Sequence, residues 1–199
     1  MRPAVRSVLR QLEDATGALT LDVQGHEVPV TNLAKPLWPG QTKRDLLVYL
    51  ARISPALLPH LAARPVFVTR YPNGIAGKSF YQKVWDDPPP FVKSVRIWSS
   101  DNDEARDYLL CDNLATLLWL GQQAALELHV WFSSTSPGRD ARSLGTRYGA
   151  SEASLERSRL NYPDFMVFDL DPYQYSGREG RGAEPELYRP AFKRARRLA

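Results

Sequence analysis

The sequence predicts an α+β fold in which a mixed or antiparallel sheet is flanked by helices and preceded by an N-terminal helix and a hairpin. Short runs rich in alternating or β-branched apolar residues recur along the chain, which is typical of strands. Segments with apolar residues at helical spacing lie between them. The chain has 199 residues, of which 43% are apolar. That is enough for one large core, and we expect one domain over residues 1–199.

The N-terminal third predicts a helix, a hairpin and a second helix. Apolar residues recur at helical spacing over residues 5–12, and residues 19–30 alternate around a Gly-containing turn. Thr42 has the features of an N-cap, with Asp45 completing a capping box. We expect this second helix to end near Ser54 and Pro55, because proline lacks an N–H and disfavours helix in the preceding residue.

The middle of the chain predicts a series of strands and one further helix. The helix is expected to be capped by Asp112 and to end near Gly121, and residues 99–107 are expected to form a polar loop. Residues 133–163 form a long polar segment, which we interpret as a mobile surface insertion with a short helix near residues 150–159. The strand-like runs are residues 64–70, 92–98, 108–111 and 126–131.

The charge is distributed unevenly. Residues 32–83 carry eight basic groups and one acidic group, whereas residues 84–177 carry eight basic and 14 acidic groups. This asymmetry favours a polyanion-binding surface beside a cation-binding one, although solvated faces also carry charge.

The remaining composition bounds the class of protein. Cys111 is the only cysteine. A disulfide framework and a cysteine-based zinc site are therefore excluded, and a buried thiol in a reducing compartment is expected. No run reaches the roughly 18 apolar residues of a membrane span, and the first residues lack the apolar region of a signal peptide. We interpret the protein as cytoplasmic, with no membrane partner.

Residues 165–172 form a short apolar run that ends in two aspartates, and we expect a buried strand there. Alternation places Asp169 and Asp171 on one face, with Cα atoms about 6–7 Å apart. Carboxylates at this spacing can share a divalent cation or bridge two of them. Alternatively, Asp171 and Pro172 form only a solvated turn.

Two further motifs point toward nucleic-acid chemistry. Phe80 and Tyr81 lie between Lys78 and Lys83 in a Gly-containing setting. Base stacking and phosphate pairing need such groups, although one ring of an adjacent pair usually faces a core. His129 lies on a strand face with polar neighbours, and a lone histidine in such a place is more often structural.

Several of these strings, in this order, resemble the polymerase domain of bacterial ATP-dependent DNA ligase D, of the archaeo-eukaryotic primase superfamily. The similarity spans roughly residues 28–198. The strings that carry it are Thr31–Pro39, Arg70–Gly74, Phe80–Lys83, Leu110–Leu120, Leu126–Trp131 and Val167–Pro172.

The resemblance implies template-dependent nucleotide addition at DNA ends and gaps during non-homologous end joining. It further implies a nucleoside triphosphate substrate and Mn²⁺ or Mg²⁺ as the metal. The implied partners are gapped DNA with a 5′-phosphate, the Ku protein and a ligase domain, and the implied location is the nucleoid. The residues that match family positions are Asp169 and Asp171 as catalytic metal ligands, His129 at the nucleotide, and Arg70, Lys78, Phe80, Tyr81 and Lys83 at DNA.

Three departures from the family pattern qualify this interpretation. The segment over residues 133–163 is longer than the family's usual connection before the strand with Asp169 and Asp171. Thr69 stands where at least one family member has a lysine, which leaves the phosphate-binding residue open. Residues 172–199 contain no aspartate or histidine. The family has a third metal-binding aspartate downstream, so we expect this chain to be an N-terminal part of the domain that ends inside a helix over residues 188–198. Two alternatives stay open: a non-catalytic DNA-end-binding module, and another metal-dependent phosphoesterase.

Overall fold

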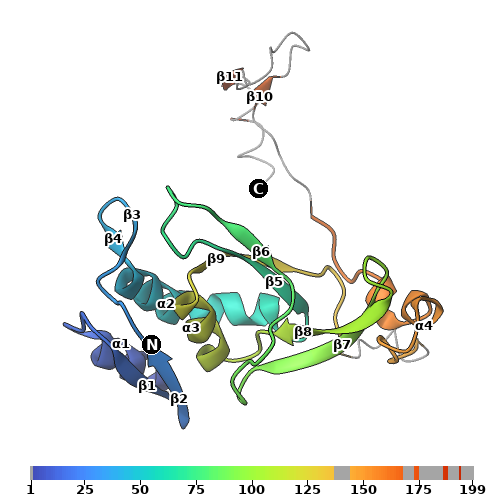
Figure 1. Ribbon diagram of the computed structural model, residues 1–199, viewed down its shortest axis with the longest axis horizontal. Coiled ribbons are helices and arrows are strands. Elements are labelled where there is room, and N and C mark those ends of the chain that lie inside the picture. The colour runs from blue at the N-terminus through green and yellow to red at the C-terminus, as the bar shows by residue number, and fades with distance from the viewer. Residues whose placement is uncertain (1, 137–143, 168–172, 175–185, 188–192, 194–199) are drawn as a thin grey trace. The chain divides into compact units, whose positions relative to one another are not determined.

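The computed structural model describes residues 2–136, 144–167, 173–174, 186–187 and 193 (Figure 1). The chain divides into two compact units, residues 1–164 and residues 165–199. The second unit contains the antiparallel pair β10 (Tyr173–Gln174) and β11 (Glu186–Leu187). The helix expected over residues 188–198 lies outside the described residues, apart from Lys193. No described helix is long and apolar enough to cross a membrane.

The N-terminal helix and hairpin form as predicted. Helix α1 (Pro3–Leu12) buries Val5, Val8 and Leu12. Strands β1 (Leu19–Val23) and β2 (His26–Val30) pair antiparallel. Gln24 and Gly25 both have positive φ, at 57° and 84°. A two-residue turn of this kind matches the twist of the strands that it joins.

Helix α2 (Lys43–Leu61) follows the short pair β3 (Pro36–Trp38) and β4 (Gln41–Thr42). The predicted capping box is confirmed. The Asp45 N–H donates to Thr42 Oγ1 at 3.3 Å, and the Thr42 N–H donates to the Asp45 carboxylate at 2.7 Å. These bonds satisfy two of the backbone donors that a helix start leaves unpaired.

The expected break at Ser54 and Pro55 is wrong, because α2 continues through Pro55 and Pro59 to Leu61. Pro55 has no N–H to donate to the carbonyl of Ala51, which lies four residues earlier. Instead, the buried Ser54 hydroxyl donates to that carbonyl at 2.8 Å. The side chain before the proline thus replaces the missing backbone bond.

We expect Ser54→Ala to lower the free energy of unfolding by about 1–3 kcal/mol, because the Ala51 carbonyl is then buried without a donor. Denaturant unfolding monitored by circular dichroism measures this change. Ser100→Ala is the control, since Ser100 is exposed and a surface change of this size is worth about 0.5 kcal/mol or less. Equal midpoints for the two variants would show that the Ser54 hydroxyl does not support the helix.

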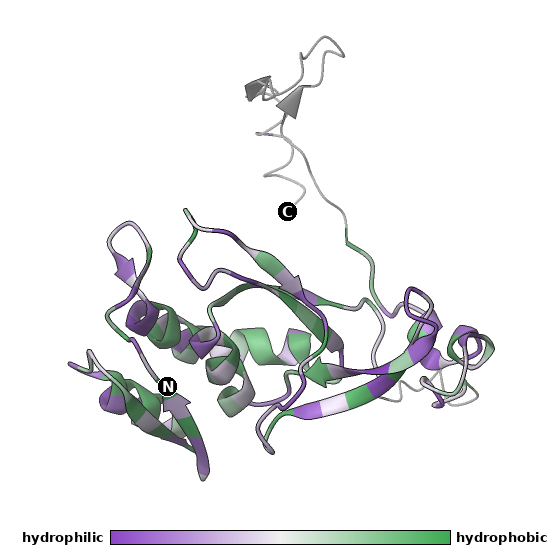
Figure 2. Ribbon diagram, in the orientation of Figure 1, coloured by the Kyte–Doolittle hydropathy of each residue, from purple (hydrophilic) through white to green (hydrophobic). Residues whose placement is uncertain are grey.

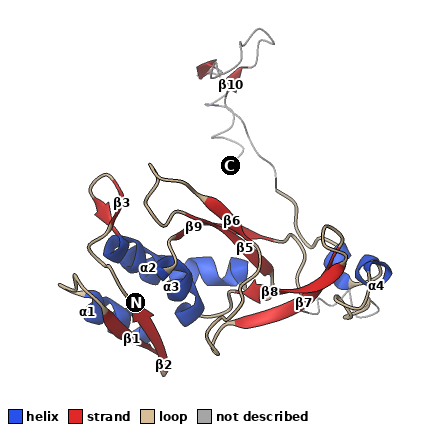
Figure 3. Cartoon of the chain, in the orientation of Figure 1, coloured by secondary structure: helices blue, strands red, loops and turns tan. Residues whose placement is uncertain are grey.

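Strand β5 (Pro65–Arg70) lies at the centre of an antiparallel sheet (Figure 3). Its one edge pairs with β9 (Ala125–Val130). Its other edge pairs with β8 (Glu104–Leu110) at its start and with β6 (Phe80–Gln82) at its end. Three strands therefore meet on β5, which brings residues distant in sequence to one surface.

Strand β7 (Lys93–Ser99) pairs with the whole of β8 at the margin of the sheet. The loop predicted for residues 99–107 is therefore wrong at Ser99, which ends β7, and from Glu104 onward. Arg96 and Asp107 are cross-strand partners and form an ion pair of 2.9 Å. A polar stretch of sequence can therefore form a strand here, because opposite charges on exposed cross-strand partners stabilise the pairing.

Helix α3 (Leu114–Gln122) packs closely on α2, and apolar residues run along both helices (Figure 2). A Cβ atom on Gly121 would lie 2.6 Å from Leu50 Cδ1, so a larger residue there would require the Leu50 side chain to move. The predicted cap at Asp112 is wrong by one residue, since Asn113 accepts from the Thr116 N–H at 2.8 Å. Asp112 instead accepts from the Ala63 N–H at 2.8 Å.

The described part of residues 133–163 packs against the sheet. It includes helix α4 (Glu152–Glu156), close to the short helix that the sequence predicts, and a 3₁₀ helix over Arg159–Asn161. Tyr148 and Leu160 are buried in a small apolar cluster with Ile97 and Tyr108 of the sheet.

Candidate nucleic-acid interface

One face of the sheet carries a cluster of aromatic rings. Phe67 of β5 is the cross-strand partner of His129 on β9, and Thr69 of β5 is the partner of Tyr81 on β6. The Phe67 and His129 rings stack at 4.9 Å, and the Tyr81 ring lies 5.5 Å from His129. Tyr81 is 64% exposed. Sites that stack nucleobases use exposed rings of this kind.

A polar network orients His129 within this cluster. Its Nε2 lies 3.0 Å from Thr69 Oγ1 and 3.3 Å from a Glu127 carboxylate oxygen. The Tyr71 hydroxyl also donates to Glu127. Hydrogen bonds from Tyr71, then Thr69 and His129, hold the pKa of Glu127 below its ordinary value, and the same contact with Glu127 raises the pKa of Tyr71.

The position of Glu127 determines which ring nitrogen of His129 is left for a ligand. An ionised carboxylate only accepts hydrogen bonds, so a proton on His129 Nε2 would be donated to Glu127, 3.3 Å away. Nε2 faces Thr69 and Glu127, which leaves Nδ1 as the ring nitrogen that a ligand could contact. The sequence reasoning missed Glu127, although it alternates with His129 on the same strand face.

Phe80 and Arg70 lie on the opposite face of the same strands. The Arg70 guanidinium lies 5.3 Å from the Phe80 ring and 5.1 Å from the Trp85 ring. It donates to the Gln123 carbonyl at 2.8 Å, to the Gln123 side chain at 3.0 Å and to Gln82 at 2.7 Å. Burial lowers the pKa of Arg70. Phe80 and Tyr81 therefore offer rings on two different faces, and Arg70 is held by protein partners.

The two predicted DNA-binding lysines are exposed near β6. Lys78 lies in the loop before the strand, and Lys83 follows the strand directly. Lys83 forms an ion pair of 3.5 Å with Asp101. Such an exposed pair is worth little, so it leaves Lys83 available to a phosphate.

Sequence reasoning assigned no role to Lys43, the first residue of α2, which is only 7% exposed. Burial lowers the pKa of Lys43, and the nearby charges of Lys35 and Arg70 lower it further. Lys43 also lies at the positive end of the helix dipole. No ion pair with it is formed by the residues that the structure describes. Burial, like charge and helix dipole all disfavour a cation here, and a bound anion would relieve each of them.

Lys35 extends this basic site toward a hollow of about 700 Å³ that Asn32 also lines. Its ammonium group donates to Asn73 Oδ1 at 3.2 Å. Two features of the sequence could have identified Lys43. It is a cation at a helix start, where the dipole disfavours positive charge, and it lies within a strongly basic block of sequence.

Comparison with known proteins identifies the family. The model of the LigD primase-polymerase domain matches residues 42–180. The chain belongs to this family. The resemblance inferred from the motifs and the expected α+β fold are thereby confirmed.

Relatives and one solved structure share the LigD name. The chain is 40% identical over 102 residues to the bifunctional non-homologous end joining protein LigD of Bacillus subtilis, covering 51% of this chain and 16% of that protein. It is 33% identical over 150 residues to the multifunctional LigD of Mycobacterium bovis, covering 73% and 17%. The chain therefore spans about a sixth of these relatives' length. The polymerase domain from Mycobacterium tuberculosis Ligase D in complex with DNA aligns with a TM-score of 0.52 and 33% identity, covering 56% of this chain and 40% of that one.

The two predicted metal ligands, Asp169 and Asp171, lie outside the described residues. The residues just before them, 165–167, form no strand, and Met166 and Val167 are exposed. The predicted buried strand is therefore wrong for its first three residues. Among the described residues, no three His, Cys, Asp or Glu side chains gather as a metal site.

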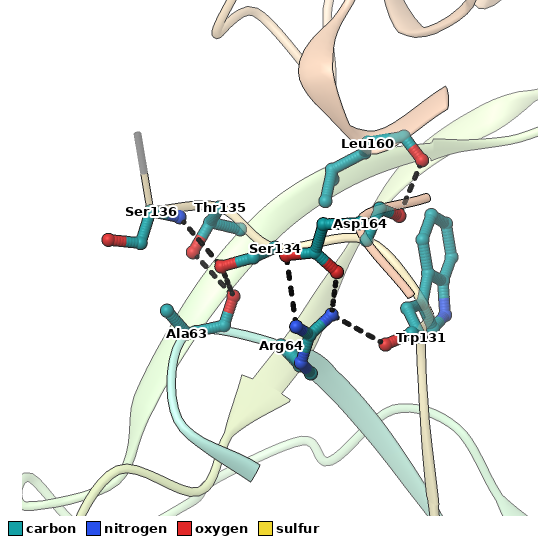
Figure 4. Close-up of polar contacts among 9 residues, drawn as sticks. Ala63, Arg64, Trp131, Ser134, Thr135, Ser136, Leu160 and Asp164 are labelled. Carbon is teal, nitrogen blue, oxygen red and sulfur yellow. Dashed lines mark hydrogen bonds and ion pairs between the residues drawn. The ribbon is translucent and has the colours of Figure 1, made fainter. Parts of the chain in front are cut away.

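The chain that leads toward this motif is fixed to the sheet at Asp164 (Figure 4). Arg64 forms an ion pair of 2.8 Å with Asp164 and donates to the Trp131 carbonyl at 3.3 Å. Ser133 adds a bond of 2.6 Å to the carbonyl of Leu160. These contacts connect the start of β5, the end of β9 and the segment before the aspartates.

The other end of this anchor is the carbonyl of Ala63. It accepts from the Thr135 N–H at 2.7 Å and from the Thr135 hydroxyl at 2.9 Å. Ser134 donates to the same oxygen at 3.3 Å. The chain therefore leaves β9 in a fixed direction, beside the strand that carries Phe67 and Thr69.

Proposed function

We propose that this chain binds DNA ends and adds nucleotides to 3′ ends or gaps by template-dependent phosphoryl transfer, in non-homologous end-joining repair. The observation that carries the proposal is Lys43, a buried cation without an acidic partner among the described residues, in a chain of the LigD primase-polymerase family. A 5′-phosphate supplies the anion that Lys43 and Lys35 lack.

The remaining site residues divide between DNA and nucleotide. Phe80 and Tyr81 stack on bases, and Lys78 and Lys83 pair with the backbone. His129 contacts the incoming nucleoside triphosphate through the ring nitrogen that Thr69 and Glu127 do not occupy. Arg70 is held by hydrogen bonds to Gln123 and packs against the Phe80 ring. Only the N–H groups that these bonds leave free can contact DNA.

Asp169 and Asp171 would hold Mn²⁺ or Mg²⁺, because carboxylate oxygens suit hard divalent cations. When bound, such ions neutralise phosphate charge and favour ionisation of the primer 3′-hydroxyl. Phosphoryl transfer needs positioning and charge neutralisation more than a protein nucleophile. Ku, a ligase domain and a cytoplasmic, nucleoid-associated location belong to the same proposal.

The decisive experiment measures manganese-dependent addition of a ribonucleotide to a gapped DNA duplex, with and without a 5′-phosphate at the gap. We expect addition, and tighter binding when the phosphate is present. Binding without addition would favour the alternative, a non-catalytic DNA-end-binding module. Absence of both would reject the proposed function.

We expect Tyr81→Ala and Phe80→Ala each to weaken DNA binding by about 1–3 kcal/mol, the usual contribution of one stacked base. Both rings are exposed, at 64% and 46%, so the free energy of unfolding should change little. Fluorescence anisotropy with labelled gapped DNA measures binding. Tyr49→Ala is the matched control, because Tyr49 is 57% exposed but lies on α2. Equal affinities for all three variants would exclude stacking on these rings.

A further inference from the structure

Four arginines line a groove between α1 and α2. Arg6 and Arg10 come from α1, and Arg44 and Arg52 come from α2. The groove encloses about 520 Å³ and includes the apolar side chains of Leu9, Leu12 and Val48. None of the four arginines takes part in an ion pair within the part of the chain that the structure describes. Each of the two helices therefore contributes two arginines to the lining of the groove.

Apart from Arg10, which lies in the last turn where the dipole favours a cation, the charges on and beside α1 disfavour an isolated helix. Arg2, Arg6 and Arg10 are four residues apart, so they lie on one face and repel one another. Arg2 occupies the N-cap without a capping bond, and the first turn has no acidic residue. The acids Glu13 and Asp14 instead follow the C-terminal end, where the dipole disfavours them. A polyanion against this face would offset the repulsion.

The acidic residues of the groove are gathered at one end. Glu13 and Asp14 line it beside Arg44 and Asp45, and Asp45 is already bound to Thr42. The two helices run antiparallel, because Ala4 at the start of α1 shares a second hollow with Ser54 and Leu58, late in α2. The opposite end of the groove, at Arg6 and Arg52, therefore lacks acidic lining residues.

The acidic end adjoins the hollow that contains Lys35. The Arg44 N–H donates to the carbonyl of Leu33 at 3.0 Å, and the Ala34 N–H donates to the carbonyl of Thr16 at 3.1 Å. Leu33 and Ala34 connect Asn32 with Lys35, and Thr16 lines that same hollow. A strand that leaves the Lys35 hollow can therefore continue along α1. The helix has ten residues, which gives about 15 Å, or roughly four nucleotide steps.

We propose that the groove between α1 and α2 binds the phosphodiester backbone of DNA beyond the 5′-phosphate. The choice of DNA as the partner rests on the proposed function. Six of the groove's ten lining residues lie between residues 6 and 14, outside residues 42–180 that match the family model. The arginine groove thus lengthens the bound stretch of duplex on the downstream side.

The test compares gapped, 5′-phosphorylated DNA whose downstream duplex, closed by a hairpin loop, is short, about 4 base pairs, or long, about 12. A strand that starts at the Lys35 hollow must first pass that hollow and then needs roughly four further steps for α1, so only the long duplex reaches along the whole helix. Arg6→Gln/Arg10→Gln should lose about tenfold in affinity for the long duplex and leave the short one unchanged. Its slope of log K against log salt should fall by about 1.8, from two lost phosphate contacts. Arg147→Gln/Arg157→Gln is the charge-matched control, on exposed residues of another region, and should keep the wild-type slope.

Two outcomes would overturn the proposal. One is an unchanged slope and affinity on the long duplex. The other is an equal loss on both duplexes, which would indicate a structural role of α1, and thermal unfolding of the variant would show it. Failure of the proposed function is a different result, because the wild-type chain would then show no dependence on the 5′-phosphate with either duplex.

Discussion

Lys43→Met is expected to stabilise the fold while it removes the preference for a 5′-phosphorylated end. Methionine keeps the length of the side chain and its helix propensity, but it has no charge to desolvate. It also removes the repulsion from Lys35 and Arg70, the two charges that act with burial on this residue. The free energy of unfolding at neutral pH should therefore rise.

The pH dependence of stability has a defined sign. The pKa of Lys43 in the folded chain lies below its ordinary value of 10.5. The unfolded chain thus holds more protons as pH rises from the folded pKa to 10.5, and the stability contributed by this group increases across that window. In the wild type, alkaline conditions should recover part of the stability that the buried charge costs. Lys43→Met should lack this rise.

The binding measurement completes the prediction. Loss of a charge-assisted contact of about 1.5–3 kcal/mol corresponds to roughly 10–100-fold weaker binding of 5′-phosphorylated gapped DNA. Binding of the same DNA without the phosphate should change much less. Lys93→Met is the control, because Lys93 is exposed and forms only a surface ion pair with Asp112, at 3.3 Å. A destabilised Lys43→Met variant that keeps phosphate selectivity would contradict both parts of the argument.

The elements that sequence could predict are those set by local chemistry. The capping box of Thr42 and Asp45, the hairpin turn at Gly25 and the alternation around His129 depend on neighbouring residues, and all three appear in the structure. Cys111 is buried as expected, and burial raises the pKa of its thiol to about 12.

The features that sequence reasoning missed depend on contacts made after folding. Pro55 does not end its helix, because the buried Ser54 hydroxyl replaces one backbone bond. Asp112 accepts from the Ala63 N–H on another segment, and its neighbour Asn113 caps the helix. Lys43 is distinguished by its burial, and Glu127 by its contacts with residues on other segments. A single sequence contains no direct record of such contacts.

Asp169→Ala is expected to abolish nucleotide addition while leaving DNA binding nearly intact. Asp169 and Asp171 are one residue apart, and together they form the acidic motif that would hold the divalent ion. Loss of one carboxylate removes charge neutralisation worth several kcal/mol in the transition state, which is on the order of a thousandfold or more in rate. The residues proposed to hold DNA, Lys43 and Tyr81, are unchanged.

The two readouts separate a catalytic role from a structural one. Addition of a ribonucleotide to gapped DNA is measured across a manganese titration, and binding of the same DNA is measured by anisotropy. Asp86→Ala is the matched control, because Asp86 is an exposed aspartate in a loop and has no proposed role. Unchanged addition by Asp169→Ala would reject the metal assignment. Equal loss of binding and addition would show that Asp169 supports the fold, since the cation and ring contacts to DNA are made by other residues.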